Sequence, residues 1–156
     1  MLLGVISDTH KEIAYIRKAM KKLQGVDMLI HLGDNVVDVE EIEKTFKGPI
    51  INVRGNCDFS TKVPFERTMV LEGKKLLITH GHKYGVKDNL LKLRYRALEL
   101  GADLVLYGHT HVSKVDFEEG IFFVNPGSCT LPKNGLNSVA TVEITEEKIN
   151  PSIIVI

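Results

Sequence analysis

The chain has little or nothing of several features that mark other classes of protein. It has only two cysteines, Cys57 and Cys129, among 156 residues. Two cysteines cannot build a disulfide framework, and neither lies in a Cys-x-x-Cys pair of the redox or zinc-knuckle type, so we expect reduced thiols in a cytoplasmic protein. The 20 basic and 20 acidic residues cancel. We therefore expect no bulk nucleic-acid binding, and any attraction for phosphate must be local.

Long apolar runs are also missing from the sequence. None reaches the length that crosses a membrane. The chain opens directly on a strand-like segment, residues 2–6, without a basic region or a small-residue cleavage site. The sequence thus predicts neither export nor membrane insertion. Repeats, low-complexity tracts and linkers are absent as well, which favours a single domain over residues 1–156.

What the chain does have is a regular alternation of short apolar runs and helical patterns. Apolar runs at residues 2–7, 28–32 and 50–53 predict strands. The amphipathic spacing of residues 13–23 and the acidic stretch 39–46 predict helices between them. This order is typical of βαβ units around a buried, largely parallel sheet.

The second half of the chain predicts strands of a different kind. Two apolar segments within residues 67–79 are joined by Glu72-Gly73-Lys74, a hairpin signal, so antiparallel strands make the sheet mixed. A helix is predicted over residues 87–100 and a buried strand over 104–107. We expect a second, antiparallel layer from the remaining β-rich runs, which are residues 112–117, 121–124, 138–144 and 149–156.

Short blocks of acid, amide and imidazole side chains follow these apolar runs. They read Asp8-x-His10, Gly33-Asp34, Gly55-Asn56-Cys57-Asp58, Thr79-His80-Gly81-His82 and Gly108-His109-Thr110-His111. Four of them fall at the carboxyl ends of predicted strands, where α/β sheets bind ligands, and His80 reaches the same rim if its strand joins the same sheet. Because such side chains are costly to gather in a dry cleft without compensating cations, the sequence predicts a metal site.

The number of candidate ligands predicts two ions rather than one. Seven are too many for a single tetrahedral ion but suit two ions that share a bridging carboxylate, for which Asp34 is the natural choice. Nitrogen and oxygen donors favour Mn²⁺, with Ni²⁺, Fe²⁺ or Zn²⁺ as alternatives. We expect the Asp-x-His and His-x-His patterns to be extended segments, whose period of two places both side chains on one side.

The five blocks, in this order, resemble the calcineurin-like metallophosphoesterase superfamily. The small size, Cys57 and the Asn125-Pro126-Gly127-Ser128 block are similar to its compact, YfcE-type phosphodiesterases, and the match extends over residues 6–128. The resemblance implies an α/β fold, the four-layer αββα sandwich with mixed β-sheets. It implies one ion held by Asp8, His10, Asp34 and His111, and a second held by Asp34, Asn56, His80 and His109.

The resemblance also implies hydrolysis of phosphoric diester bonds, with a hydroxide held by the two ions attacking phosphorus in line. Asp34, Asn56 and His109 are the expected catalytic residues among the ligands. Many relatives carry histidine where this chain has Cys57, and there the imidazole is thought to assist the leaving group. A thiol, with its pKa of about 8.5, is a poor general acid near neutral pH, so we expect activated aryl diesters to be better substrates than alkyl monoesters.

For several residues near the blocks, the sequence leaves two interpretations open. His82 is either an exchanged metal ligand or a group that contacts the phosphate. Asp58 either orients the metal site or is a turn residue. Asn125 and Ser128 either form an anion nest or belong to an ordinary turn. His31 lies inside an apolar strand and is better explained as a hydrogen-bonded core residue than as a ligand.

Two other functions stay open beside the phosphodiesterase. The superfamily includes a scaffold, the retromer subunit Vps29, whose similar fold serves protein assembly rather than robust hydrolysis. A metal-storage or sensor domain would bind ions without turnover. All seven ligand positions hold competent Asp, Asn or His here, which a pure scaffold would not require. A small phosphodiester is thus the expected substrate, and the apolar C-terminal strands could support a homodimer.

Overall fold

The computed structural model describes residues 1–156 and arranges ten strands in two five-stranded sheets. The first sheet has the order β10 (Ile149–Val155), β9 (Ser138–Ile144), β1 (Leu2–Ile6), β2 (Met28–His31) and β3 (Ile50–Asn52). The second has the order β4 (Glu66–Leu71), β5 (Lys74–Thr79), β6 (Leu104–Leu106), β8 (Ile121–Pro126) and β7 (Ser113–Glu118). Both sheets are mixed, because three adjacent strands of each are parallel (β1, β2 and β3 in the first, β5, β6 and β8 in the second) and the others pair antiparallel.

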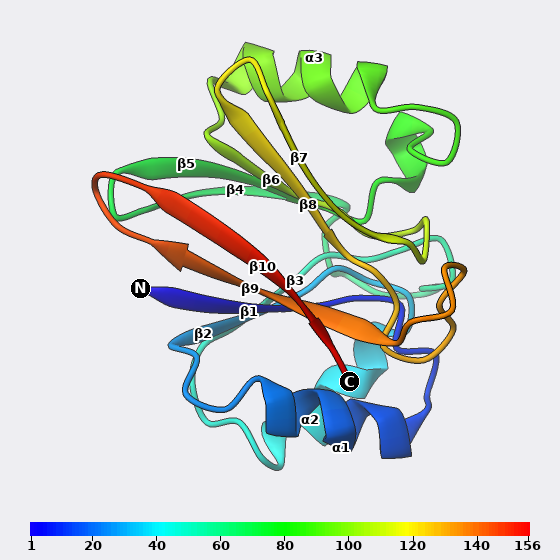
Figure 1. Cartoon of the computed structure of the whole chain (residues 1–156). Helices are drawn as coiled ribbons and strands as arrows, with labels where there is room; N and C mark the ends of the chain where they lie inside the picture. Colours follow the sequence, from blue (N-terminus) through cyan, green and yellow to red (C-terminus); the bar gives the residue numbers. More distant parts are fainter.

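Helices cover the outer face of each sheet (Figure 1). α1 (Ile13–Lys22) and α2 (Val39–Glu43) pack on the first sheet, and α3 (Leu91–Leu100) packs on the second. The apolar stripe of α1 faces its sheet with Ile16, Ala19 and Met20, as its amphipathic spacing predicts. Two short 3-10 turns complete the elements, η1 (Val36–Asp38) and η2 (His82–Tyr84). The layer order helix, sheet, sheet, helix is the αββα sandwich that the family resemblance implies.

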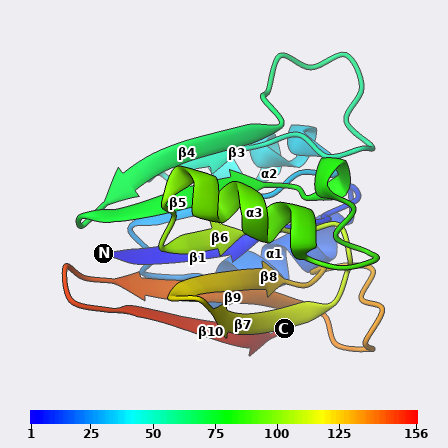
Figure 2. The same ribbon diagram turned by 90° about the horizontal axis from the view of Figure 1, so that it is seen from above.

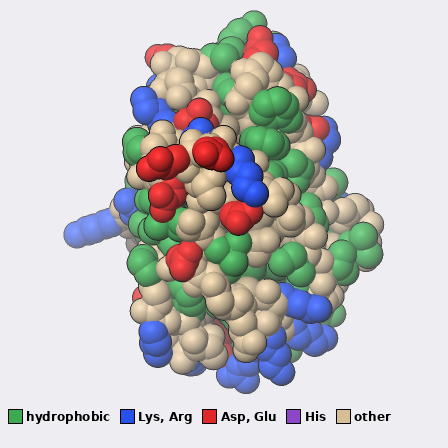
Figure 3. All heavy atoms as spheres, turned by 60° about the vertical axis from the view of Figure 1, so that its left-hand side comes forward, with side chains coloured by type: hydrophobic (Ala, Val, Ile, Leu, Met, Phe, Trp, Pro, Cys, Tyr) green, Lys and Arg blue, Asp and Glu red, His purple; other side chains and the backbone are tan.

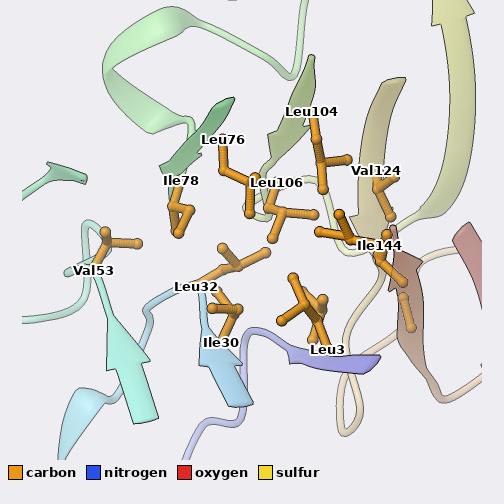
Figure 4. Close-up of a cluster of buried hydrophobic side chains, with 13 residues drawn as sticks. Leu3, Ile30, Leu32, Val53, Leu76, Ile78, Leu104, Leu106, Val124 and Ile144 are labelled. Carbon is orange, nitrogen blue, oxygen red and sulfur yellow. The ribbon is translucent and has the colours of Figure 1, made fainter. Parts of the chain in front are cut away.

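The main hydrophobic core lies between the two sheets (Figure 4). Leu3 and Ile30 of the first sheet face Leu76 and Leu104 of the second, and all four are fully buried. Because side chains alternate along a strand, strands such as β1, β6 and β8 also send residues outward to the helices. Each such buried Leu or Ile contributes roughly 1.5–3 kcal/mol relative to an exposed one. This core fixes the two sheets against each other and therefore fixes the loops at their edges.

The C-terminal strands do not form a separate antiparallel layer, and this prediction from the sequence is wrong. β7 and β8 join the second sheet beside β6, whereas β9 and β10 return to the first sheet, where β9 pairs with β1. An alternating pattern shows which face of a strand is buried but not which strand lies beside it. Helix α3 begins at Leu91 rather than at residue 87, because residues 85–89 form a turn in which Asp88 N donates to Gly85 O.

The loops that carry the polar blocks meet at one edge of the sandwich. Asp8 N donates to Gly33 O at 3.0 Å, and Gly108 N donates to His80 O at 3.0 Å. Figure 3 shows the molecule from the side of the N-terminus, where acidic side chains lie over the upper and middle part, basic side chains predominate at the bottom and no histidine is visible. No helix has the length and the apolar character needed to cross a membrane.

Candidate metal centre

At this edge the structure brings together all seven side chains that the sequence predicts as ligands. Six of them form two groups whose ligand atoms lie within 4.8 Å of one another, namely Asp8, His10, Asp34 and His111, and then Asp34, His80 and His109. Asn56 adjoins the second group, since its Oδ1 lies 3.2 Å from His80 Nε2. Asp34 belongs to both groups. The arrangement is that of two neighbouring sites that share one carboxylate.

Short distances link the imidazoles to the carboxylates within these groups. His80 Nε2 lies 3.5 Å from Asp34 Oδ2 and 3.1 Å from His109 Nδ1. His111 Nε2 lies 3.1 Å from Asp8 Oδ1. Nitrogen atoms of neutral imidazoles are lone-pair donors, and carboxylate oxygens carry negative charge. Such atoms at such spacings are the donor set of a divalent transition metal.

Asp8 shows most directly that the residues fit a cation. Its side chain is fully buried, and its Oδ2 accepts hydrogen bonds from Ser7 Oγ at 2.6 Å and from His109 N at 3.2 Å. Its Oδ1 is buried and has no hydrogen bond of acceptable geometry, although two imidazoles lie 3.1 and 4.0 Å away, those of His111 and His80. A buried carboxylate oxygen without a partner is costly, and a cation bound there would remove that cost.

The carboxylates and imidazoles of the two groups shift each other's pKa values. Burial alone would raise the pKa of Asp34 and lower that of His80, but their mutual interaction, together with Cys57 beside Asp34 and Asp8 beside His80, reverses both directions. The Asp8 carboxylate, 3.1 Å from His111 Nε2, raises the pKa of His111 above its ordinary value. Burial, with the nearby charge of His80, lowers the pKa of His109 to about 4. The raised pKa values of His80 and His111 mean that positive charge is favoured beside these buried carboxylates, where a divalent cation would supply it.

Backbone carbonyl groups orient two of the imidazoles. His80 Nδ1 donates to Leu32 O at 2.7 Å, and His111 Nδ1 donates to Leu131 O at 2.7 Å. These hydrogen bonds place a proton on Nδ1 and turn Nε2 of each ring toward the carboxylates. A second partner of this kind fixes the tautomer and orientation of metal-binding histidines.

Five of the seven predicted ligands lie in left-handed backbone conformations. Their φ angles are 54° for Asp8, 44° for His10, 58° for Asp34, 69° for His109 and 59° for His111. The prediction that the Asp-x-His and His-x-His patterns are extended is therefore wrong, because each strand ends before its block and the chain then curls. Left-handed conformations cost non-glycine residues roughly 1–3 kcal/mol each and concentrate at functional sites.

Asp58 ties two of the loops together. Its Oδ2 accepts hydrogen bonds from Asp34 N at 2.9 Å and Gly55 N at 2.8 Å, and its Oδ1 accepts from Asn35 N and Val36 N at 2.8 Å. The carboxylate therefore satisfies four backbone N–H groups of the loops after β2 and β3. Of the two interpretations left open by the sequence, this geometry favours the residue that orients the site.

Asn125 and Ser128 lie behind the site rather than in it. Asn125 Nδ2 donates to Gly108 O at 3.0 Å, and Ser128 Oγ donates to Asp8 O at 2.8 Å and accepts from Leu131 N at 2.9 Å. Both side chains are fully buried. Their polar groups hold the backbone of the ligand loops, so the geometry does not favour the anion-nest interpretation.

His31 occupies the core, in agreement with its place in an apolar strand. Its Nδ1 accepts a hydrogen bond from Gly33 N at 3.2 Å, and its Nε2 lies 3.1 Å from Thr9 Oγ1. The Thr9 hydroxyl in turn donates to Asp38 Oδ2 at 2.5 Å. Burial lowers the pKa of His31 to about 4, so the ring is neutral. The roles of Thr9 and Asp38 were not predicted from the sequence. The position of Thr9 inside the Asp8-x-His10 block is the signal that points to it.

His82 and Cys57 lie beside the two groups. The His82 ring centroid lies 5.3 Å from that of His80 and 6.0 Å from that of His109, and its Nδ1 is buried without a partner. The exposed Cys57 donates its backbone N–H to Asp34 Oδ1 at 2.9 Å. Partial burial and the Asp34 carboxylate raise the pKa of the Cys57 thiol to about 11.

Known proteins share the sequence features of this chain over most of its length. Residues 1–147 match the model of the calcineurin-like phosphoesterase superfamily domain. Phosphodiesterase YfcE of Escherichia coli (strain K12) is 37% identical over 160 residues, with 86% of this chain and 83% of that protein covered. Vacuolar protein sorting-associated protein 29 of Schizosaccharomyces pombe is 38% identical over 160 residues, with 99% and 83% covered.

Solved structures agree with the sequence relatives. The crystal structure of a Streptococcus pneumoniae TIGR4 protein, described as a predicted phosphoesterase, has a TM-score of 0.84 and 31% sequence identity to this chain. The superposition covers 99% of this chain and 88% of that one. The similarity thus extends over the whole sandwich, including every strand end that carries a polar block.

Proposed function

Because the chain belongs to the calcineurin-like phosphoesterase superfamily, we propose that it is a phosphodiesterase that uses two divalent cations. A fold by itself does not determine an activity. The observation that carries the proposal is the pair of ligand groups that share Asp34 at the edge of the sandwich. A pair of ions about 3.5–4 Å apart is the arrangement with which two-metal phosphoesterases clamp the oxygens of an in-line displacement.

The proposed ligands divide between two ions. Asp34 would be shared by both ions, while Asp8, His10 and His111 would hold the first and Asn56, His80 and His109 the second. When bound, the ions would supply charge to the phosphoryl oxygens and lower the pKa of a water molecule toward neutrality. Nitrogen and oxygen donors favour Mn²⁺, with Ni²⁺, Fe²⁺ or Zn²⁺ as alternatives.

The chain's own contribution is to fix these donors before a substrate arrives. The carbonyl groups of Leu32 and Leu131 hold two imidazoles with Nε2 toward the site. The carboxylate of Asp58 holds the loop of Asp34 against that of Gly55. Preorganised groups need no reorganisation during the reaction, and this preorganisation is the larger part of electrostatic catalysis.

The substrate that we propose is a small phosphodiester with a good leaving group. The balanced charge of the chain gives no extended attraction for a nucleic acid. Cys57 stands where an imidazole would assist an alkoxide leaving group, and a thiol transfers a proton poorly near neutral pH. Activated aryl diesters such as bis-p-nitrophenyl phosphate are therefore the expected substrates, and alkyl monoesters the poor ones.

The substitution Cys57→His tests this leaving-group argument. We expect kcat/KM for an alkyl monoester such as glycerol phosphate to rise by a factor on the order of 10², the lower range of general acid catalysis. Cys57→Ala is the matched control, because it removes the thiol without adding an imidazole, and it should give no such gain. If the unmodified protein turns over the monoester as well as the activated diester, the argument is wrong.

Metal-stimulated hydrolysis tests the proposed function itself. The metal-free protein should not hydrolyse bis-p-nitrophenyl phosphate, and added Mn²⁺ should restore turnover. Asp34→Asn keeps an oxygen for Cys57 N but removes the bridging charge, so kcat/KM should fall by a factor on the order of 10² or more. Asp27→Asn is the matched control, since Asp27 accepts a backbone N–H from Leu2 at the opposite ends of the strands. Its activity should equal that of the unmodified protein.

The similarity to vacuolar protein sorting-associated protein 29 supports a second candidate, a scaffold for protein assembly. A scaffold has no need for seven competent ligands converging in one place, and this observation favours the enzyme. No hydrolysis with Mn²⁺, Ni²⁺, Fe²⁺ or Zn²⁺ would favour the scaffold. Tight metal binding without turnover would favour a storage or sensor domain.

A further inference from the structure

A cluster of basic and aromatic side chains, to which the proposed function assigns no role, lies beside the second ligand group. The connection between β3 and β4 projects beyond the sheets (Figure 2) and ends with Phe65. Arg54 Cζ lies 3.6 Å from the centroid of the Phe65 ring, and Lys83 Nζ lies 3.4 Å from it. The ring of His82 lies 5.5 Å from the same centroid. We call these four residues the Phe65 cluster.

Neither cation of the Phe65 cluster has an acidic partner. No carboxylate oxygen lies within 4.0 Å of Arg54 or Lys83, since the ion pairs of the structure join other residues. The Arg54 guanidinium donates one hydrogen bond, to Thr61 O at 3.2 Å, and its Nε is buried without a partner. Two positive charges therefore share one aromatic ring, and a guanidinium N–H group has no acceptor. The missing counter-charge disfavours the cluster unless an anion binds to it.

The carboxylates nearest in the chain are engaged elsewhere. Asp58 accepts four backbone N–H groups. Glu66 accepts hydrogen bonds from Arg96 at 2.8 Å and from Tyr84. Neither carboxylate is therefore available to neutralise the Phe65 cluster, and an anion for it must come from outside the chain.

The His82 side chain connects the Phe65 cluster to the candidate metal centre. His82 is in contact with both, because its ring centroid lies 5.5 Å from Phe65, 5.3 Å from His80 and 6.0 Å from His109. Lys83 is exposed, and Arg54, Phe65 and His82 are partly exposed, so the cluster is open to solvent. A substituent attached to a phosphoryl group at His80 and His109 can reach the cluster across the His82 ring.

We propose that Arg54 and Lys83 bind a second anionic group of the substrate, so that this site is built for phosphodiesters that carry a further carboxylate or phosphate. The inference rests on the proposed function for the position of the reacting phosphate. A guanidinium offers a planar fork to either anion, and an ammonium adds a point charge. Phe65 holds the two cations at its ring, which reduces the ordering that binding would otherwise require.

A pair of chromogenic diesters that differ in one charge tests the inference. 4-Carboxyphenyl p-nitrophenyl phosphate and 4-carbamoylphenyl p-nitrophenyl phosphate have nearly the same shape, but only the first has the second anion. For the Mn²⁺-loaded protein we expect kcat/KM to be roughly tenfold higher, or more, for the carboxylate. In Lys83→Gln and in Arg54→Gln the ratio of the two values should fall toward one.

Lys62→Gln is the matched control, because Lys62 is an exposed lysine of the same loop and makes no contact with the Phe65 ring. Its ratio should equal that of the unmodified protein. A kcat/KM ratio near one in the unmodified protein would overturn the inference. An equal fall of the ratio in Lys62→Gln would also overturn it, because the effect would then come from the general positive charge of the loop rather than from the Phe65 cluster. Arg54 also holds Thr61 O, so if Arg54→Gln fails to fold, the exposed Lys83→Gln decides the result alone.

A second pair of substrates distinguishes phosphate from carboxylate as the preferred anion. The p-nitrophenyl ester of thymidine 5′-phosphate, with and without a 3′-phosphate, replaces the carboxylate by a phosphate at the far end of the substrate. A larger ratio for this pair than for the aryl pair assigns phosphate to the cluster, and a smaller one assigns carboxylate. The same three variants should behave as with the aryl pair.

Binding measurements separate this inference from the proposed function. The Mn²⁺-loaded protein is titrated calorimetrically with 4-carboxyphenylphosphonate and with 4-carbamoylphenylphosphonate, neither of which can be hydrolysed. A roughly tenfold difference in affinity that disappears in Lys83→Gln supports the inference, whether or not any diester is turned over. If no diester is turned over, the proposed function is wrong but the inference about the second anion still holds. Equal affinities, or no binding of either compound, would overturn the inference even if diesters are hydrolysed.

Discussion

At the scale of single residues, His31 lies directly behind the candidate metal centre and connects two of its loops. It accepts a hydrogen bond from Gly33 N and contacts the hydroxyl of Thr9, which stands between two of the proposed ligands. Only a neutral imidazole can accept at Nδ1. Protonation of His31 would therefore break the contact with Gly33 and place an unpaired charge in a fully buried position.

The depressed pKa of His31 predicts a loss of stability in mild acid. In the unfolded chain the imidazole takes up a proton below its ordinary pKa of 6.5, but in the folded protein it does so only below about 4. Between these values the unfolded state binds more protons, so the free energy of unfolding falls as the pH falls from 6.5 toward 4. The full effect is about 3 kcal/mol, of which about 2 kcal/mol is lost by pH 5.

Urea unfolding of the metal-free protein at pH 8 and pH 5 measures this effect. His31→Gln is the comparison, because an amide does not titrate, although it lowers stability at both pH values. The difference between the two pH values should be smaller in His31→Gln by about 2 kcal/mol. If the two proteins lose the same stability between pH 8 and pH 5, His31 is not buried in the neutral form.

At the scale of elements, the loops after β2 and β3 approach each other more closely than a side chain would permit. A Cβ atom added at Gly55 would lie 2.6 Å from Asp34 N and closer still to Asp34 Oδ1. A Cβ atom at Gly33, whose φ is 95°, would lie 2.9 Å from Arg54 C. The glycines of the Gly-Asp and Gly-Asn blocks are therefore needed for the close contact that brings Asp34 beside Asn56.

Gly55→Ala should separate these two loops and weaken metal binding. We expect the affinity for Mn²⁺, measured calorimetrically, to fall by a factor of roughly 10 or more, as it does when groups that orient ligands are lost. Gly120→Ala is the control, because Gly120 has a φ of 80° in the β7–β8 turn with nothing within 4 Å of an added Cβ. It should cost about 1 kcal/mol of stability without changing the affinity. Unchanged Mn²⁺ binding by Gly55→Ala would contradict the account.

The local elements could be predicted from the sequence, but their pairing could not. β1, α1 and β2 lie within one residue of where periodicity places them, because burial of one face leaves a direct pattern in the chain. The return of β9 to the first sheet has no such pattern, since β9 and β8 are both largely buried strands and nothing in either one names its neighbour. His80 reaches the site although its strand lies in the second sheet, because both sheets end at the same edge.

The sequence predicted which residues gather at the candidate site, but not the backbone geometry in which they are held. The polar blocks mark which side chains gather, since each follows an apolar strand. Asp and His adopt left-handed conformations more often than most residues, but this preference is too weak to predict five such positions. The left-handed backbone is imposed by contacts from distant parts of the chain, such as the hydrogen bond from Ser128 Oγ to Asp8 O. The roles of Asp58 and Asn125 could not be predicted for the same reason, because these side chains bind backbone groups of loops that lie far away in the sequence.

At the scale of the whole molecule, the candidate metal centre joins the two sheets. Asp8, Asp34 and Asn56 follow strands of the first sheet, whereas His80 and His109 follow strands of the second. Ions held by both sets would cross-link the sandwich at one edge, in addition to the apolar core between the sheets. Metal binding should therefore stabilise the entire fold rather than one loop.

Removal of metal should lower the thermal unfolding midpoint. Mn²⁺ at 100 times its dissociation constant should stabilise the folded protein by about 2.7 kcal/mol. For a chain of this length that corresponds to a rise of about 5–10 °C, which excess EDTA should reverse. Differential scanning calorimetry checks this, with Asp34→Asn as the variant that should respond least. A midpoint that is the same with Mn²⁺ and with EDTA would contradict a cross-link between the sheets.

The most direct test of the central claim is anomalous scattering from crystals soaked in Mn²⁺. The account predicts two anomalous peaks about 3.5–4 Å apart, with Asp34 bridging them, Asp8, His10 and His111 around one, and Asn56, His80 and His109 around the other. A single peak, or two peaks that do not share Asp34, would contradict it.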